Sequence, residues 1–247
     1  MLVAAAVCPH PPLLVPQVAA GAAPELDDLR QACDRALDAL AAVDPEVLVV
    51  VGGGTRTRRH PPGSAGSLRR YGVDVDVSLG AAAPGGPGGP GGPGGPAAPT
   101  LPLSLSIGAW LLTRSGLRAA TVGWEVASDA PTDDCRALGE RLAAEADRVA
   151  LLVMGDGSAR RSPQAPGYED PRAAAYDAAV VQALADGDGE ALLVLDPAES
   201  AELMAAGRAA WQVLAGAAAD QLTDTAVLYD AAPYGVEYVV ALWERHG

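Results

Sequence analysis

Two histidines and one glutamate give this chain the ligand types of a non-haem iron site. His10 lies in the segment Cys8-Pro-His-Pro-Pro12, where prolines fix the backbone on both sides of the ring. A ring held in this way suits a metal ligand or a general base, since both need a preorganised imidazole. Of the three histidines, His246 is penultimate, where we expect a frayed end. A two-histidine, one-carboxylate iron centre would therefore use His10 and His60, with Glu237 as the carboxylate.

Plainer interpretations of the same side chains stay open. His10 would equally serve by hydrogen-bonding the end of its strand, and Cys8 has the character of a small core residue. His60 follows three arginines in Arg56-Thr-Arg-Arg-His60, which would repel a cation. We therefore expect a surface loop at His60 unless it swings in as a ligand.

Four further polar residues are candidates for binding a substrate. Asp156, Ser158 and Arg160 fall within one glycine-rich turn, and Tyr234 falls within the segment Asp230–Gly235. Together they have the chemistry to bind a small polar or anionic molecule. An ordinary solvated turn would show the same composition.

The composition excludes several other chemistries. All 17 basic residues are arginine, so Schiff-base catalysis and a Gly-Lys phosphate loop are excluded. Ser158 lacks the Gly-x-Ser-x-Gly pattern of a nucleophile elbow. A hydrolase with Ser158 or Cys8 as nucleophile and His10 as base stays open. Three widely spaced cysteines favour a reducing cytoplasm, and a net charge of -14 argues against nucleic acids and anionic membranes as partners.

The surrounding pattern predicts strands that alternate with helices. Short, continuous apolar runs predict strands buried on both faces, and helical periodicity appears between them. Strands are predicted at Leu2–Val7, Val47–Val51, Gly72–Leu79, Ala119–Val126, Ala150–Met154, Ala226–Tyr229 and Val236–Trp243. Helices are predicted from Pro24 onward, at Ser104–Ser115, at Thr132–Asp147, and as two or three helices within Pro171–Ala219.

These elements predict an α/β protein, with one three-layer α/β/α domain over residues 1–247 and a mostly parallel central sheet. Four Gly-Gly-Pro triplets at 84–96 form a low-complexity insert, which we expect to be a surface loop. The segments that hold the candidate residues follow predicted strands. Because open α/β sheets bind ligands at the carboxyl ends of their strands, we expect the site there.

The order of motifs resembles one known family. Cys8-Pro-His-Pro-Pro-Leu-Leu-Val-Pro16, Met154-Gly-Asp-Gly-Ser-Ala-Arg-Arg161 and Tyr229-Asp-Ala-Ala-Pro-Tyr-Gly235 resemble the subunit-B-like branch of class III extradiol ring-cleavage dioxygenases, the superfamily that includes the Memo proteins. The likeness covers most of the chain outside the insert. It implies a single α/β domain, Fe(II) held by two histidines and a glutamate, and a catechol-type substrate cleaved with O2. A small partner subunit or a homo-oligomer stays open.

The chain departs from that pattern at two positions. His10 matches the first metal histidine, but the second should follow the Val47–Val51 strand, where Gly52–Thr55 stands instead. An acid/base histidine should lie near Ser158, where Ala159 follows. Two functions are therefore predicted. One is a dioxygenase-like protein in which His60 replaces the missing ligand. The other is a metal-free member that binds a small aromatic or other polar molecule, or a protein partner.

Overall fold

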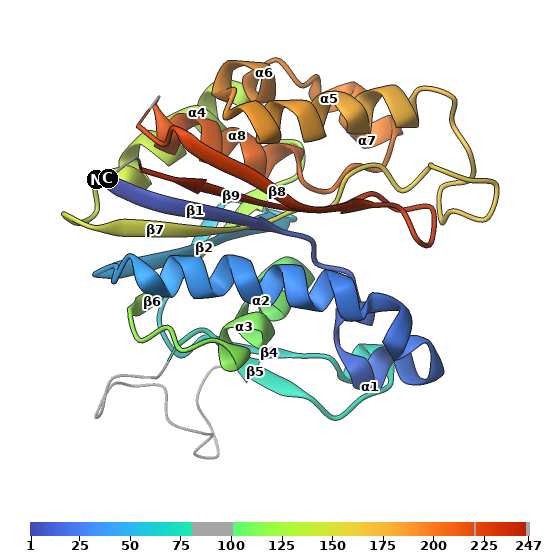
Figure 1. The fold of residues 1–247 in the computed structure, drawn as a ribbon, viewed down its shortest axis with the longest axis horizontal. Coiled ribbons are helices and arrows are strands. Elements are labelled where there is room, and N and C mark those ends of the chain that lie inside the picture. The colour runs from blue at the N-terminus through green and yellow to red at the C-terminus, as the bar shows by residue number, and fades with distance from the viewer. Residues whose placement is uncertain (81–100, 220, 246–247) are drawn as a thin grey trace.

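A seven-stranded sheet lies between two layers of helices (Figure 1). The computed structural model describes residues 1–80, 101–219 and 221–245. The Gly-Gly-Pro insert at 84–96 therefore lies outside the described residues. The predicted α/β class, with its mostly parallel central sheet, is confirmed.

The strands of the main sheet run in the order β3-β6-β2-β7-β1-β9-β8. The pairs β6–β2, β2–β7 and β7–β1 are parallel, while β3–β6, β1–β9 and β9–β8 are antiparallel. The strands are β1 (Leu2–Cys8), β2 (Val47–Gly54), β3 (Arg58–His60), β6 (Ala120–Ala127), β7 (Val149–Met154), β8 (Asp224–Ala231) and β9 (Tyr238–Glu244).

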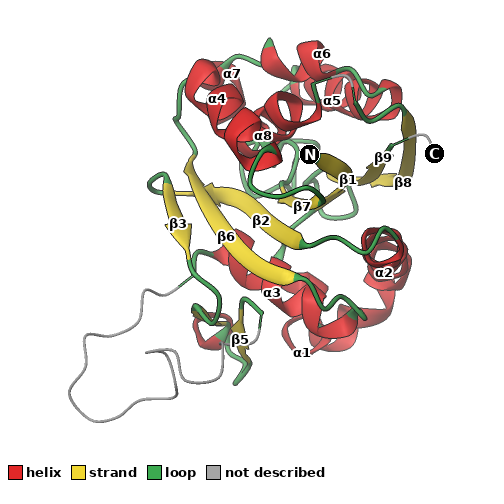
Figure 2. Ribbon diagram, turned by 90° about the vertical axis from the view of Figure 1, so that its left-hand side faces the viewer, coloured by secondary structure: helices red, strands yellow, loops and turns green. Residues whose placement is uncertain are grey.

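Helices cover both faces of this sheet (Figures 1 and 2). One face carries α1 (Pro16–Ala19), α2 (Asp27–Ala42) and α3 (Leu103–Arg114), together with the small β4–β5 sheet (Ala65–Ser67 and Asp76–Ser78). The other face carries α4 (Thr132–Ala143), α5 (Ala173–Asp186), α6 (Gly189–Leu193), α7 (Pro197–Glu202) and α8 (Arg208–Ala218). Short 3-10 helices span 12–14, 20–26 and 69–71.

Apolar sequence explains the central strands. Every residue of β1 (LVAAAVC) and of β7 (VALLVM) is buried, as a strand covered on both faces requires. In α2, Leu29, Cys33, Leu37 and Leu40 are buried at helical spacing. Each face of the sheet thus has its own aliphatic core, packed under its helices.

Some elements differ from the prediction. Within Gly72–Leu79 only Asp76–Ser78 is a strand, and it pairs with β4 instead of joining the main sheet. The Pro171–Ala219 segment holds four helices. Two of the three divisions fall at Asp188 and Asp196, whose carboxylates accept the N–H groups of Ala191 and Glu199 and so begin new helices.

Two pairs of neighbouring strands continue onto opposite faces. The chain leaves β1 toward α2 on one face and leaves β7 toward α5 on the other. Likewise the next α-helix after β2, reached through β3, β4 and β5, is α3, while the adjacent β6 is followed by α4 on the opposite face. Because chain segments diverge at such points, a crevice forms at the strand ends, and ligands of open α/β sheets bind there. We name these places the β1/β7 and β2/β6 switch points.

Candidate functional site

His10 and Asp156 meet at the β1/β7 switch point. The backbone N–H of His10 donates to Asp156 Oδ1 over 2.7 Å, and His10 Nδ1 lies 3.5 Å from the same oxygen. His10 is 8% exposed, and its Nδ1 has no hydrogen-bond partner among the described residues. Burial raises the pKa of Asp156, while the proximity of His10 opposes that rise. The Asp156 carboxylate thus fixes the turn that carries the ring.

A buried polar network lies beside this pair. Asp177, on α5, accepts the Ser158 N–H on Oδ1 over 2.7 Å and the Ser158 hydroxyl on Oδ2 over 2.5 Å. Arg161 Nη1 lies 3.3 Å from Asp177 Oδ2 and also donates to Glu237 Oε2. Backbone bonds between Gly157 and Glu237, and from Glu237 to Ser158, join the two loops. We call Ser158, Arg161, Asp177 and Glu237 the Arg161 network.

Burial controls the charge of this network. It raises the pKa of Glu237 to about 8; the neighbouring Asp230 adds to that rise and Arg161 opposes it. Burial also raises the pKa of Asp177, against the hydrogen bonds from Ser158 and Arg161. Glu237 Oε1 is buried without a partner among the described residues. At neutral pH the protonated form of Glu237 is therefore favoured, and its Oε2 still accepts the hydrogen bond from Arg161.

The network borders a hollow of about 290 Å³. Arg161 and Asp177 line it from the network, Asp230 lines it from β8, and the small side chains of Ala174 and Ala178 line it from α5. The Arg161 side chain is 30% exposed, so its guanidinium is accessible to a ligand. Positive and negative groups thus face one small space.

The other two predicted substrate residues point elsewhere. Arg160 Nε donates to the carbonyl of Gly167 over 2.7 Å and Nη1 to that of Glu202 over 2.9 Å. Tyr234 donates its hydroxyl to Glu25 Oε2 over 2.8 Å. Both side chains tie loops together. None of the four predicted substrate residues, Asp156, Ser158, Arg160 and Tyr234, lines the hollow at the Arg161 network. Arg161, and not the predicted Arg160, is the arginine that lines the hollow.

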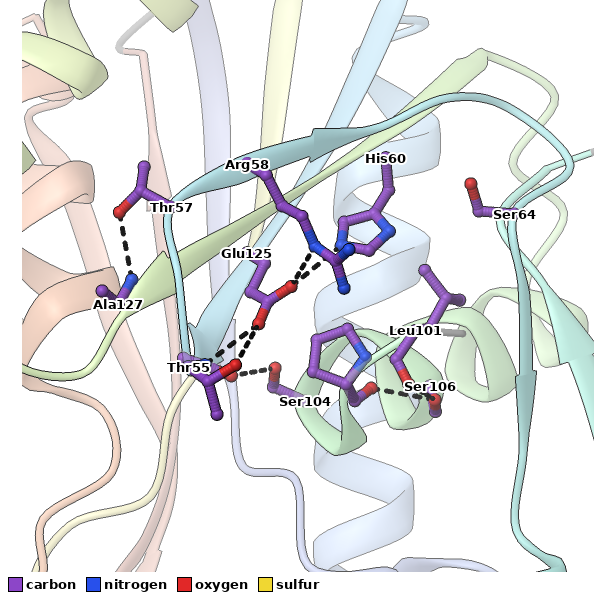
Figure 3. Close-up of polar contacts among 12 residues, drawn as sticks. Thr55, Thr57, Arg58, His60, Ser64, Leu101, Ser104, Ser106, Glu125 and Ala127 are labelled. Atoms are coloured by element: carbon purple, nitrogen blue, oxygen red, sulfur yellow. Dashed lines mark hydrogen bonds and ion pairs between the residues drawn. The ribbon is translucent and has the colours of Figure 1, made fainter. Parts of the chain in front are cut away.

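His60 belongs to a different polar cluster at the sheet edge (Figure 3). On β3 it is 1% exposed, and its Nε2 lies 3.2 Å from Oε2 of Glu125 on β6. Arg58 Nε donates to the same oxygen over 2.7 Å, and the Thr55 N–H donates to Oε1 over 3.0 Å. Burial acts to raise the pKa of Glu125, but the bonds from Arg58 and His60 hold it below its usual value. The predicted surface position of His60 is wrong.

Packing explains the glycines that follow the buried part of β2. A Cβ on Gly54 would lie 2.4 Å from Glu125 Oε1, and a Cβ on Gly52 would lie 2.6 Å from Ser104 Oγ. Ser104 in turn donates its hydroxyl to the carbonyl of Gly53 over 2.7 Å. The glycines thus admit buried polar side chains close to the backbone.

The predicted iron ligands are not brought together. His60 lies on β3, and β6, β2 and β7 stand between it and β1, which leads to His10. Four strand spacings of about 4.8 Å separate the two backbones by roughly 19 Å. Glu237 is held by Arg161. Across residues 1–80, 101–219 and 221–245, no group of three His, Cys, Asp or Glu side chains lies close enough to hold a metal ion. These residues do not fit the iron that the resemblance implies.

A hydrolytic site is not assembled either. The Ser158 hydroxyl donates to Asp177 rather than to an imidazole, and Ser158 is fully buried. Cys8 is fully buried in the core beside α2. A nucleophile needs a base within hydrogen-bond reach and access to substrate.

Comparisons with known proteins identify the fold and go no further. The sequence matches no known family model and no curated protein. Among solved structures, it is similar to the uncharacterized protein JW3007 from Escherichia coli K12, with a TM-score of 0.58 and 15% sequence identity. The match covers 98% of this chain and 99% of that one, so the likeness in fold extends over the whole domain. In the part of the chain that the structure describes, no helix is long and apolar enough to cross a membrane.

Proposed function

We propose that this protein is a metal-independent member of the class III extradiol dioxygenase-like superfamily that binds a small polar molecule at the Arg161 network. The order of its motifs supports the superfamily, and His10 lies two residues after the end of β1, in the position that the resemblance implies for a metal histidine. Because ligands of open α/β sheets bind at the carboxyl ends of strands, the position of Arg161 in the segment after β7, where it lines a hollow, supports a binding role.

One observation carries the metal-independent part of the proposal. Glu237, the carboxylate that the resemblance assigns to iron, instead accepts a hydrogen bond from the guanidinium of Arg161. A buried carboxylate needs a cation or a proton, and here the chain supplies both, through Arg161 and through the raised pKa of Glu237. No iron is required to balance this charge.

The hollow beside the network indicates the kind of ligand. Arg161 offers a planar, permanently charged donor for a carboxylate or another anionic group. The exposed carboxylate of Asp230 lies across the hollow and suits a donor or an ammonium group. A small molecule that carries groups of both kinds fits these walls best.

A binding experiment tests the proposal with three simple probes. Serine carries both charges, lactate only the anion, and ethanolamine only the cation. We expect serine to raise the melting temperature of the EDTA-treated full chain most, and Asp230→Asn to abolish its advantage over lactate. Asp224→Asn, an exposed change on the same strand, is the control and leaves the serine effect unchanged.

Analysis of bound iron tests the metal-independent part of the proposal. After anaerobic incubation with Fe(II) and desalting, we expect no stoichiometric iron in the protein. If iron is retained in the wild type and lost in His10→Ala, the metal-independent proposal fails. An equal response of the wild type and Asp230→Asn to serine would contradict binding at the Arg161 network.

A further inference from the structure

A second hollow, of about 570 Å³, lies at the β2/β6 switch point. Ser128 and Asp129, which follow β6, form one side, while α7 and the turn to α8 form the other. In that turn the carbonyl of Ala206 packs against Gly53 of β2. The hollow shares no lining residue with the one at the Arg161 network. Its volume lies within the range typical of small-molecule sites, about 300–1,000 Å³.

The side formed by α7 and the following turn is mainly apolar. Apart from Ser128, Asp129 and Ser200, every lining residue is alanine, proline or methionine. Met204 is 49% exposed and adopts a φ of 55°, in the left-handed region that non-glycine residues rarely occupy. Its exposed thioether and the alanines of α7 would be removed from water by an apolar ligand, which favours binding.

The polar side chains of the hollow can accept hydrogen bonds from a ligand but have none left to donate. The Ser128 hydroxyl donates to the carbonyl of Gly54 over 3.1 Å, and the buried Ser200 hydroxyl donates to that of Asp196 over 2.7 Å. The third polar side chain is Asp129, whose ionised carboxylate is an acceptor only. A ligand group that meets these side chains should therefore be a donor.

The charge of the hollow also favours a cation. Within the described residues, Asp129 is the only charged residue that lines it; Asp129 is exposed and forms no ion pair there. The buried Arg208 lies behind the same turn, where its guanidinium donates to the carbonyls of Ser128 and Ala130, and it does not line the hollow. A cation is thus attracted by Asp129 at the rim, while Arg208 opposes its approach to the turn.

We propose that this hollow binds a small molecule in which a primary ammonium group is joined to an apolar body. The ammonium group lies beside the Asp129 carboxylate and the Ser128 hydroxyl oxygen and supplies the donors that these acceptors need. The apolar body packs against Ala201 and Met204. This ligand differs from that of the Arg161 network, since it needs no anionic group.

Three probes of equal length separate charge from hydrophobicity. Hexylamine, hexan-1-ol and hexanoate are titrated calorimetrically into the full chain at about 0.15 M salt, which screens the diffuse attraction of a net charge of -14. We expect hexylamine to bind most tightly and hexanoate least tightly. Failure of hexylamine to bind, or equal affinity for hexylamine and hexan-1-ol, overturns the proposal.

A charge variant tests the role of Asp129. Asp129→Asn should lower the ratio of hexylamine affinity to hexan-1-ol affinity by about two- to fivefold, as expected for one exposed charge pair. Asp133→Asn, an exposed change on α4 outside the hollow, is the matched control and should leave the ratio unchanged. An equal change of the ratio in the two variants would show that hexylamine responds only to the overall charge of the protein.

A filling variant locates the apolar body. Ala201→Trp fills the hollow from an exposed position on α7 and should weaken the binding of both hexylamine and hexan-1-ol by about tenfold or more. Ala179→Trp, at an exposed position on α5 that lines neither hollow, should leave both affinities unchanged. Unaltered binding in Ala201→Trp contradicts this location. Serine binding at the Arg161 network is independent of these results.

Discussion

At the scale of single residues, Glu237 shows how burial sets a charge. Its pKa is raised from 4.5 to about 8, chiefly by burial. The folded state therefore holds a proton that the unfolded state releases near its ordinary pKa. Stability falls as pH rises from the unfolded value toward the folded one, because deprotonation then opposes folding.

The variant Glu237→Gln tests this directly. Glutamine keeps the shape but cannot ionise, so the fall in unfolding free energy between about pH 5 and pH 8 should become shallower than in the wild type. Urea denaturation at several pH values within this window measures the slope. Glu169→Gln, at an exposed position, should follow the wild-type slope. Parallel curves for Glu237→Gln and the wild type would show that Glu237 titrates normally.

The pKa of Glu125 is shifted in the opposite direction to that of Glu237. Because its pKa is lowered, it stabilises the fold above the ordinary carboxyl pKa, and this contribution is lost as pH falls through the folded value. Arg58→Met removes the donor that lies 2.7 Å away and should cost about 1–3 kcal/mol at neutral pH.

The Arg58→Met deficit should shrink on acidification as Glu125 is protonated. Denaturation at neutral and acidic pH measures it. Arg59→Met is the matched control, since Arg59 is exposed on the same strand and forms no hydrogen bond or ion pair with Glu125. If the loss of stability is constant with pH, or equal in the two variants, Arg58 does not stabilise the protein through the charge of Glu125.

At the scale of elements, the buried strands and amphipathic helices were predictable, since continuous apolar runs and helical spacing survive into the structure. Strand β3 was not, because Arg58-Arg59-His60 has no apolar pattern and is held by pairing with β6. The same pairing places Arg58 opposite Glu125. A register of this kind leaves no local signal in the sequence, so the Glu125 cluster could not be foreseen.

The end of β2 gives a prediction at this scale. Gly54→Ala would place a methyl group 2.4 Å from Glu125 Oε1, so it should destabilise the protein by about 1–3 kcal/mol through overpacking. Chemical denaturation measures the loss. Gly116→Ala meets nothing within 4 Å and should be nearly neutral or slightly stabilising. Equal stabilities for the two variants would mean that the close approach at Gly54 is readily relieved.

At the scale of the whole molecule, strand order decided which candidate residues meet. The sequence correctly placed His10, Asp156 and Ser158 after strands, whereas Glu237, predicted within the Val236–Trp243 strand, lies just before β9. Ser158 and Glu237 join one network with Arg161, and His10 joins Asp156, because their strands lie near one another in the sheet. His60 was predicted as a partner of His10 although no sequence pattern reveals that three strands separate β3 from β1. Contacts of Arg161 and Asp177 likewise depend on how α5 packs.

This separation predicts that His10 and His60 act independently on stability. The effects of His10→Ala and His60→Ala on the unfolding free energy should add in the double variant to within about 0.5 kcal/mol, because residues far apart without shared partners do not couple. Denaturation is measured in EDTA and again with anaerobic Fe(II). A metal shared by His10 and His60 would bind only when both rings are present. The two changes would then be strongly non-additive with Fe(II) but additive in EDTA. Additivity in both conditions is expected for a fold in which His10 and His60 lie far apart and share no metal ion.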